Sequence, residues 1–206
     1  HVDIAADSIM ARTTGGDFYD YYVRHPNGDV IMLVADVSGK SLPAAIFMAI
    51  SNSILRTIIR SEMEPEVILQ MANELIYEES QSGMFVTVFL AHYNPASGLL
   101  KYASAGQNDM LLVNDDGSYK LLSGKGSPLG VLPRQRYTGG QIEVDKSDVL
   151  ILYTDGVTEA IDPQSEEFGL DKLIELIREN RSLPPQKLIE KIYSEVVAFS
   201  NSSDQY

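Results

Sequence analysis

The chain contains three short runs that are apolar almost without interruption. They lie at residues 30–35, 85–91 and 149–153 and are rich in Val, Ile, Leu and Phe. Short runs without the alternation of apolar and polar positions that marks a half-exposed strand predict strands covered on both faces. We therefore expect these three strands to lie in the interior of the fold.

Turn signals join these runs to further strands. Residues 17–23 lead into the first run through Pro26-Asn27-Gly28-Asp29, which predicts a β-hairpin. Similar breaks at residues 94–98 and 115–117 predict a meander that pairs residues 85–93 with 99–104 and residues 110–114 with 119–122. Residues 123–140 are rich in Gly and Pro and predict one long loop.

Helical periodicity appears in two separate groups. Ser41, followed by Pro43, predicts the start of one helix, and a second helix follows Pro65. The C-terminal group lies at residues 170–177 and, after two prolines, at residues 188–197. Helix pairs segregated from antiparallel strands predict an α+β layered sandwich and not an alternating βαβ fold. The apolar positions at helical spacing in the first group are Leu42, Ala45, Ile46, Ala49, Ser53, Ile54 and Ile58, then Val67, Ile68, Met71 and Leu75.

Composition narrows the classes of function. A chain of 206 residues, 44% hydrophobic and 22% charged, suits one globular domain. The absence of Cys excludes a disulfide framework, a thiolate zinc site and every mechanism with a cysteine nucleophile. A net charge of -13 argues against a nucleic-acid partner and against contact with an anionic membrane.

The chain also carries no segment that would take it into a membrane. No apolar run approaches the roughly 20 residues that a membrane span needs. The sequence begins at His1 without an initiator Met or a signal pattern. We expect a single cytoplasmic domain over residues 1–206, cut from a longer chain that includes an upstream sensor or regulatory domain.

Aspartates at the ends of the predicted strands are the candidate chemistry. Asp36 follows the run at 30–35, Asp155 follows the run at 149–153, and Asp17 opens the first hairpin. Carboxylates held at strand ends, where water still reaches, suit a site for a hard cation. Aspartates in such places also cap turns and helices. Spacing alone leaves both interpretations open.

Three other features carry less information. Residues 37–41 end like a phosphate-binding P-loop, but the first glycine that this motif requires falls on Val34, inside a strand. Residues 16–19 are similar to the Gly-Gly-Asp-Glu-Phe turn of diguanylate cyclases, with Phe18 in place of the second acid, which leaves a nucleotide cyclase as an alternative. The three histidines are scattered, which favours solvated or turn positions over catalysis.

Four motifs occur together in the order and approximate spacing of one family. With them the chain resembles the PPM-type (protein phosphatase 2C-like) metal-dependent serine/threonine phosphatases. Within these it is similar to the bacterial branch typified by the sporulation stage II protein E and the sigma-factor regulators. The resemblance extends from Val2 to the end of the chain. The motifs are Gly15-Gly16-Asp17-Phe18-Tyr19-Asp20, Ala35-Asp36-Val37-Ser38-Gly39-Lys40, Ser104-Ala105-Gly106-Gln107-Asn108 and Tyr153-Thr154-Asp155-Gly156-Val157-Thr158-Glu159-Ala160.

The resemblance implies a fold, a metal centre and a reaction. The fold is a four-layer αββα sandwich of two antiparallel sheets flanked by helix pairs. The centre holds two divalent cations, Mn²⁺ or Mg²⁺, and its catalytic residues are Asp17, Asp36 and Asp155. Asp36 bridges both ions, Asp17 and the backbone carbonyl of Val37 bind one ion, and Asp155 binds the other. A metal-activated water attacks phosphoserine or phosphothreonine on a regulatory protein, typically a small anti-sigma-factor antagonist.

The resemblance leaves two further expectations. Lys40, next to Asp36 in sequence, either orients the phosphate of the substrate or neutralises Asp36. Family members end with an Asp-Asp-containing strand that supplies another metal ligand, whereas this chain stops at residues 203–206, where that motif should begin. We therefore expect a catalytic domain that lacks its final strand. The alternative to an enzyme is a catalytically silent relative that binds a regulatory protein on the same fold.

Overall fold

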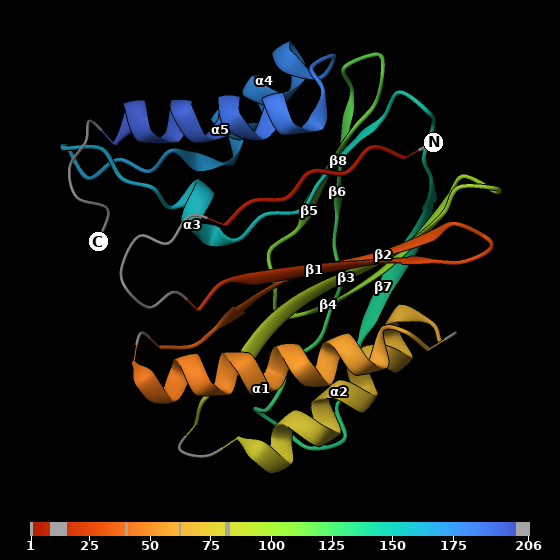
Figure 1. Cartoon of the computed structure of the whole chain (residues 1–206). Helices are drawn as coiled ribbons and strands as arrows, with labels where there is room; N and C mark the ends of the chain where they lie inside the picture. The colour runs from red at the N-terminus through yellow and green to blue at the C-terminus, as the bar shows by residue number, and fades with distance from the viewer. Residues whose placement is uncertain (1, 9–15, 40, 62, 81–82, 201–206) are drawn as a thin grey trace.

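Two antiparallel sheets lie face to face in the middle of the molecule (Figure 1). The computed structural model describes residues 2–8, 16–39, 41–61, 63–80 and 83–200, and all structural statements refer to these. The larger sheet has the strand order β1 (Phe18–Arg24), β2 (Asp29–Val37), β3 (Val86–Asn94), β4 (Leu99–Ala105) and β7 (Thr138–Glu143). The smaller sheet has the order β6 (Tyr119–Leu122), β5 (Met110–Val113) and β8 (Val149–Ile151).

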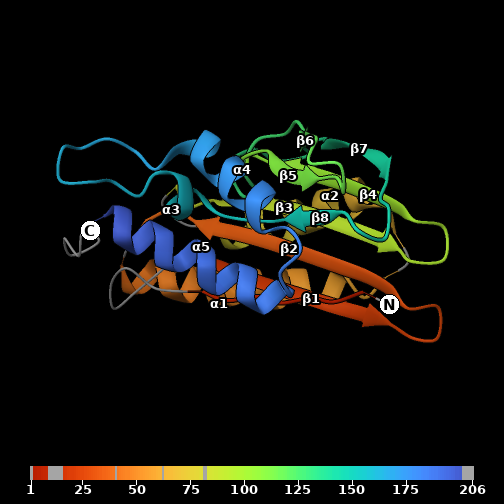
Figure 2. The same ribbon diagram turned by 90° about the horizontal axis from the view of Figure 1, so that it is seen from above.

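Helix pairs form the two outer layers. Helices α1 (Leu42–Ile58) and α2 (Pro65–Glu79) cover the larger sheet, whereas α4 (Gly169–Asn180) and α5 (Pro185–Phe199) cover the smaller one. Seen from above, α4 and α5 lie over the sheets (Figure 2), and the one-turn helix α3 (Asp155–Thr158) follows β8. No described helix is both long and apolar enough to cross a membrane. The predicted α+β class and its αββα layering are confirmed.

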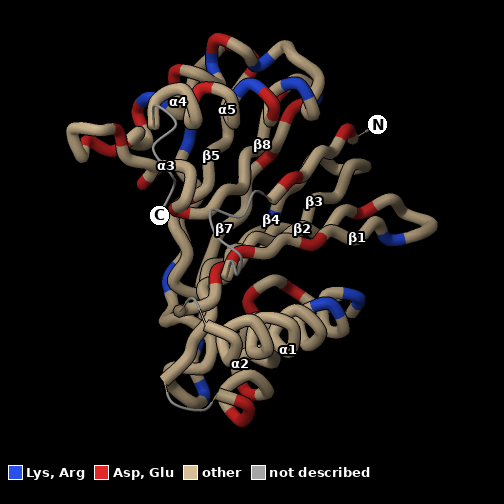
Figure 3. The backbone as a smooth tube through the Cα atoms, turned by 60° about the vertical axis from the view of Figure 1, so that its left-hand side comes forward, with Lys and Arg blue, Asp and Glu red and all other residues tan. Residues whose placement is uncertain are grey.

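The core divides into two clusters on opposite faces of the larger sheet. Because side chains alternate along a strand, Leu33 and Ala35 of β2 pack with the α1 and α2 layer, whereas Val34 packs with Phe89 and the smaller sheet. This explains the apolar runs at residues 30–35 and 85–91, whose strands are covered on both faces as predicted. Charged residues lie mainly on the helices and turns, outside this core (Figure 3).

Three expectations about elements need correction, and the first concerns the long loop. Residues 123–140 are not one loop, because β7 begins at Thr138 and pairs with β4. The strand was not predicted because it contains two glycines, and Gly has a low strand propensity. A Cβ at Gly139 would lie 1.6 Å from the carbonyl oxygen of Tyr102, so the glycine is what allows β7 to approach β4.

The second correction concerns residues 149–153. The strand β8 ends at Ile151, and Leu150 and Ile151 are half-buried instead of covered on both faces. The physical reason is that β8 lies at the edge of the smaller sheet, where it pairs with β5 along one side. An apolar run therefore indicated a strand but not its place in the sheet.

The third correction concerns the buried faces of α1 and α2. Both helices exist where predicted, and Ser41 caps α1 by accepting a hydrogen bond from the Ala44 backbone N–H at 3.4 Å. However, Leu42 is 71% exposed and Met71 39% exposed. Each helix has two apolar stripes, and the periodicity could not indicate which stripe faces the sheet. The residues that α1 and α2 bury are Ala44, Phe47, Ser51, Leu55 and Ile58, then Pro65, Ile68, Leu69, Ala72, Asn73 and Ile76.

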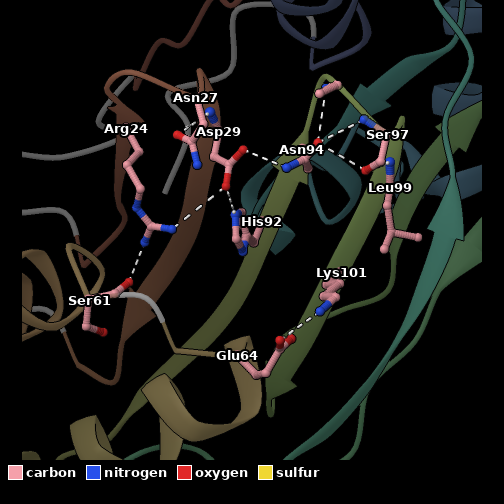
Figure 4. A network of polar contacts seen from close by, with 11 residues as sticks. Arg24, Asn27, Asp29, Ser61, Glu64, His92, Asn94, Ser97, Leu99 and Lys101 are labelled. Atoms are coloured by element: carbon pink, nitrogen blue, oxygen red, sulfur yellow. Dashed lines mark hydrogen bonds and ion pairs between the residues drawn. The ribbon is translucent and has the colours of Figure 1, made fainter.

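A buried polar network holds one end of the larger sheet (Figure 4). Asp29 is only 4% exposed, and its carboxylate contacts His92 Nε2 at 3.0 Å and accepts a hydrogen bond from Asn94 Nδ2 at 2.9 Å. Arg24 lies 3.8 Å from the same carboxylate and donates to the backbone carbonyl of Ser61 in the connection between α1 and α2. His92 is therefore neither solvated nor in a turn, but it is structural and lies five residues, or roughly 17 Å, along the strands from Asp36.

Candidate metal centre

The hairpin register brings Asp17 and Asp36 together. Phe18 pairs with Ala35 across the two strands, so the preceding residue Asp17 lies opposite Asp36. The pairing continues one step further, because the Val37 backbone N–H donates to the Gly16 carbonyl at 3.2 Å. Two residues 19 positions apart therefore share one strand end, as their motif positions predicted.

Asp36 is the electrostatic centre of this group. Its pKa is raised from 3.8 to about 7, first by burial and then by a hydrogen bond with the Asp17 carboxyl group and by the charges of Asp17 and Asp155. The Val37 backbone N–H opposes this rise by donating to the Asp36 carboxylate. Within the described residues, no Lys or Arg forms an ion pair with any of these three carboxylates.

The loop after β8 brings the third aspartate to the same end of the fold. Asp155 is the first residue of α3, and its predecessor Thr154 donates a hydrogen bond from Oγ1 to Asp17 Oδ2 at 2.6 Å. The charge of Asp155 also raises the pKa of Glu159, one turn further on. A side chain from the smaller sheet thus meets the hairpin of the larger sheet, and four acidic groups gather there.

Gly16 lets the backbone close around this group. A Cβ at Gly16 would lie 2.5 Å from the Val37 carbonyl oxygen and 2.6 Å from Asp36 Oδ1. Such contacts are far inside van der Waals range, so only glycine allows the first strand to approach the Asp36 carboxylate and the Val37 carbonyl this closely.

A cleft of ≈ 1420 Å³ opens beside the aspartates. Asp17, Asp36 and Asp155 line one end of it, and its walls come from β1, β2, β8 and α5. Apolar side chains such as Leu152 and Ile192 line much of the remainder, together with polar and charged ones such as Asp145, Lys146 and Arg181. A concave apolar cleft with a few converging polar groups is the usual form of a binding site.

The donor set fits a hard divalent cation. The three carboxylates and the nearby Val37 carbonyl offer only oxygen, which Mg²⁺ and Mn²⁺ prefer, and mutual repulsion among the carboxylates is relieved by a cation. The described residues contain no group of three or more Asp, Glu, His or Cys side chains already arranged as a metal cage. Lys40, the predicted substrate-binding residue, lies outside the described residues.

Two neighbours of the site were not among the predicted site residues. Thr154 and Glu159 both belong to the motif around Asp155. The contact of Thr154 with Asp17 depends on tertiary proximity, whereas Glu159 interacts with Asp155 one helical turn away. The signal that the sequence offered for Thr154 was its hydroxyl group directly before Asp155. Nothing in the spacing distinguished Glu159 from a solvated surface acid.

Comparison with known proteins places this geometry in a family. The family model for the stage II sporulation protein E (SpoIIE) matches residues 26–205, which is most of the chain. The chain belongs to the SpoIIE family. This match confirms the resemblance to the PPM-type phosphatases. It does not support the alternative of a nucleotide cyclase.

Two curated relatives of this SpoIIE-family chain are longer proteins. The phosphoserine phosphatase RsbU of Bacillus subtilis is 29% identical over 199 residues, which cover 95% of this chain and 58% of RsbU. Protein IcfG of Synechocystis sp. is 28% identical over 225 residues, which cover 95% of this chain and 35% of IcfG. The chain therefore spans between about one third and three fifths of the length of these relatives.

Solved structures confirm the fold of this SpoIIE-family chain. The SiaA-PP2C domain of Pseudomonas aeruginosa matches with a TM-score of 0.82 at 18% identity, covering 95% of this chain and 78% of that one. The PP2C phosphatase domain of SpoIIE from Bacillus subtilis matches with a TM-score of 0.75 at 17% identity, covering 94% and 56%. RsbX in complex with magnesium matches with a TM-score of 0.69 at 17% identity, covering 99% and 86%.

Proposed function

We propose that this SpoIIE-family chain is a metal-dependent protein serine/threonine phosphatase. The observation that carries the proposal is the meeting of Asp17, Asp36 and Asp155 at one end of the large cleft without a basic partner among the described residues. Acidic groups gathered in this way repel a phosphate unless cations lie between them and the substrate. The magnesium complex of the structurally similar RsbX and the phosphoserine phosphatase RsbU support the same assignment.

The residues of the site would hold divalent cations, and their neighbours would fix the positions of the metal ligands. In our proposal Asp36, Asp17, the Val37 carbonyl and Asp155 would hold two divalent cations, Mn²⁺ or Mg²⁺, with Asp36 as the ligand shared by both. When bound, such cations activate a water for attack on phosphorus and neutralise charge on the phosphate. Thr154 orients Asp17 through its 2.6 Å hydrogen bond, and Gly16 keeps the Val37 carbonyl close to the carboxylates.

The relatives support a proposal for the substrate class. RsbU is described as a phosphoserine phosphatase, and we propose phosphoserine or phosphothreonine on a small regulatory protein, of the anti-sigma-factor antagonist type, as the substrate here. We further propose that Lys40 contacts the phosphate, that an upstream sensor or regulatory domain controls the activity, and that the reaction takes place in the cytoplasm.

The open side of the smaller sheet supports the proposal that one more strand completes the catalytic domain. Within the described residues, β8 pairs with β5 alone, and its residues Val149, Leu150 and Ile151 line the cleft. Unpaired backbone groups at an edge accept a further strand, and a carboxylate on that strand would add a ligand at the Asp155 end.

A catalytically silent binding module is the second candidate. The observation that favours it is that the described residues form no ready-made cage of three acidic or histidine side chains. Such a module would use the same cleft to bind a phosphorylated protein without hydrolysing it.

Hydrolysis of p-nitrophenyl phosphate and of a phosphoserine peptide tests the proposal. We expect turnover that depends on added Mn²⁺ or Mg²⁺ and stops with EDTA. Replacement Asp36→Asn should lower kcat/KM by about a thousandfold or more, because the central carboxylate is lost. Asp116→Asn, an exposed turn carboxylate, is the matched control and should keep wild-type activity.

The outcomes separate the two candidates. Full activity of the Asp36→Asn variant would contradict the assigned site. A wild-type chain that binds the phosphopeptide but releases no phosphate at any metal concentration would support the binding module instead.

A further inference from the structure

Asn73 is a buried polar residue on the apolar side of α2. It is fully buried, and its helical neighbours Leu69, Ala72 and Ile76 all belong to the core. A buried amide side chain is unfavourable unless both its carbonyl and its NH₂ group are hydrogen-bonded. The partners of Asn73 therefore show what the polar side chain does there.

Both partners lie in one distant loop. Asn73 Nδ2 donates to the Leu132 carbonyl oxygen at 2.9 Å, and Asn73 Oδ1 accepts from the Gly130 backbone N–H at 3.0 Å. Gly130 has a φ of +88°, in the left-handed region that favours glycine. One side chain of α2 thus holds residues 130–132 in a conformation with a special backbone requirement.

The same loop is bonded to the start of β3. Leu129, directly before Gly130, exchanges two backbone hydrogen bonds with Val86: the Val86 N–H donates to Leu129 O at 3.0 Å, and the Leu129 N–H donates to Val86 O at 2.7 Å. Leu129 and Val86 are both fully buried, so neither bond competes with water. Any displacement of the loop would therefore move the beginning of β3.

The start of β3 in turn holds the segment that carries Asp36. The Ser38 N–H donates to the Phe85 carbonyl at 2.9 Å, and the Phe85 N–H donates to Ser38 Oγ at 2.9 Å. In addition, Val37 lies opposite Val86 in the register of β2 and β3. The backbone immediately after Asp36 is thus fixed on the side away from the Asp17 hairpin.

We propose that Asn73 is a positioning residue for the metal centre. Through the 128–132 loop and the Phe85–Val86 backbone, it sets the place of the Val37 carbonyl and of Asp36, although it touches neither. The role in metal binding rests on the proposed function, whereas the positioning itself rests on the hydrogen bonds alone.

The test compares variants of Asn73 with a core variant on the same helix. Asn73→Leu removes both hydrogen bonds and keeps the number and branching of the side-chain heavy atoms, and Asn73→Asp keeps an acceptor for Gly130 but loses the donor to Leu132. Leu69→Ala, one turn earlier and also fully buried, is the control that destabilises α2 without touching the loop. Unfolding by urea first establishes that each variant is folded.

Two measurements then decide the matter. Amide hydrogen exchange should speed up at Ser38, Phe85 and Leu129 in Asn73→Leu and in Asn73→Asp, and not in Leu69→Ala beyond its global loss of stability. Calorimetric titration should show Mn²⁺ affinity weakened about tenfold or more in Asn73→Leu and nearly unchanged in Leu69→Ala, as for other residues that orient metal ligands.

The possible outcomes are distinct from those of the proposed function. If the wild-type chain binds no Mn²⁺ and hydrolyses no phosphate, the proposed function fails, and the exchange data still judge the positioning role. If exchange at Ser38 and Phe85 in Asn73→Leu matches that in Leu69→Ala at equal stability, the positioning role is wrong whatever the activity.

Discussion

Gly16 shows how a residue without a side chain can determine the chemistry of its neighbours. The position of a Cβ there is already taken by the Val37 carbonyl oxygen and by Asp36 Oδ1, at 2.5 and 2.6 Å. Both groups are proposed metal ligands. A methyl group at residue 16 would therefore separate the hairpin from the carboxylate that it faces.

We expect Gly16→Ala to lower Mn²⁺ affinity by about tenfold or more, because Asp36 and the Val37 carbonyl must shift to make room. Calorimetric titration and kcat/KM for p-nitrophenyl phosphate measure the effect. Gly156→Ala is the matched control, since its Cβ would meet no atom closer than 3.8 Å, at Asp17 Oδ2. Equal losses in the two variants would show that crowding at residue 16 is not the cause.

At this scale the sequence was informative where the motif itself carries the chemistry. Asp17, Asp36 and Asp155 could be named because each ends or opens a strand within a contiguous motif. Thr154 could not be assigned a role, because its hydrogen bond is to Asp17, 137 residues away, and Glu159 could not be distinguished by spacing from a solvated surface acid. Asn73 was missed for the same reason: a single Asn within an apolar helix gives no sign of its partners 57 and 59 residues away.

Among the elements, α1 and α2 illustrate the limit of periodicity. Each helix was placed correctly by its proline and by its apolar spacing. Each nevertheless has apolar residues on more than one side, and tertiary packing decides which stripe meets the larger sheet. The same kind of ambiguity applies to β7, whose glycines are unfavourable in an isolated strand but necessary beside Tyr102.

Truncation of a side chain on the buried stripe of α2 should destabilise the fold much more than truncation on the exposed stripe. Ile76→Ala should lower the free energy of unfolding by about 2–5 kcal/mol, because Ile76 is fully buried and a cavity would remain. Leu75→Ala, the adjacent residue at 45% exposure, should change it by about 0.5 kcal/mol or less. Urea denaturation of both variants measures the difference. Similar losses at both positions would mean that the exposed stripe is covered in solution.

For the molecule as a whole, the electrostatics of the metal-free site affect global stability. The pKa of Asp36 is raised from 3.8 to about 7 in the folded chain, chiefly by burial and next by Asp17. Between these two pH values the folded state holds a proton that the unfolded state releases. Stability without metal must therefore fall as pH rises through this window, and Asp36 adds no further change above about pH 7.

We expect the Tm of the chain in EDTA to fall between about pH 5 and pH 7.5, and Asp36→Asn to remove most of the part due to this carboxyl group. Added Mn²⁺ should raise Tm more at about pH 8 than at about pH 5.5, because a metal ion competes with the proton. Scanning calorimetry at several pH values measures both effects. An identical pH slope in the wild type and in Asp36→Asn would contradict the assigned cause.

The network around Asp29 has a consequence for the opposite end of the same strands. Strands can slip past one another only by whole residues, and a slip of one residue turns every side chain to the other face. Asp29, bonded to neighbours on β1 and β3, makes such a slip costly. The alignment of Asp17 with Asp36 therefore depends on the Asp29 carboxylate, which does not contact substrate. A screen for inactive variants should recover alleles at Arg24, Asp29 and Asn94 that leave every proposed ligand intact.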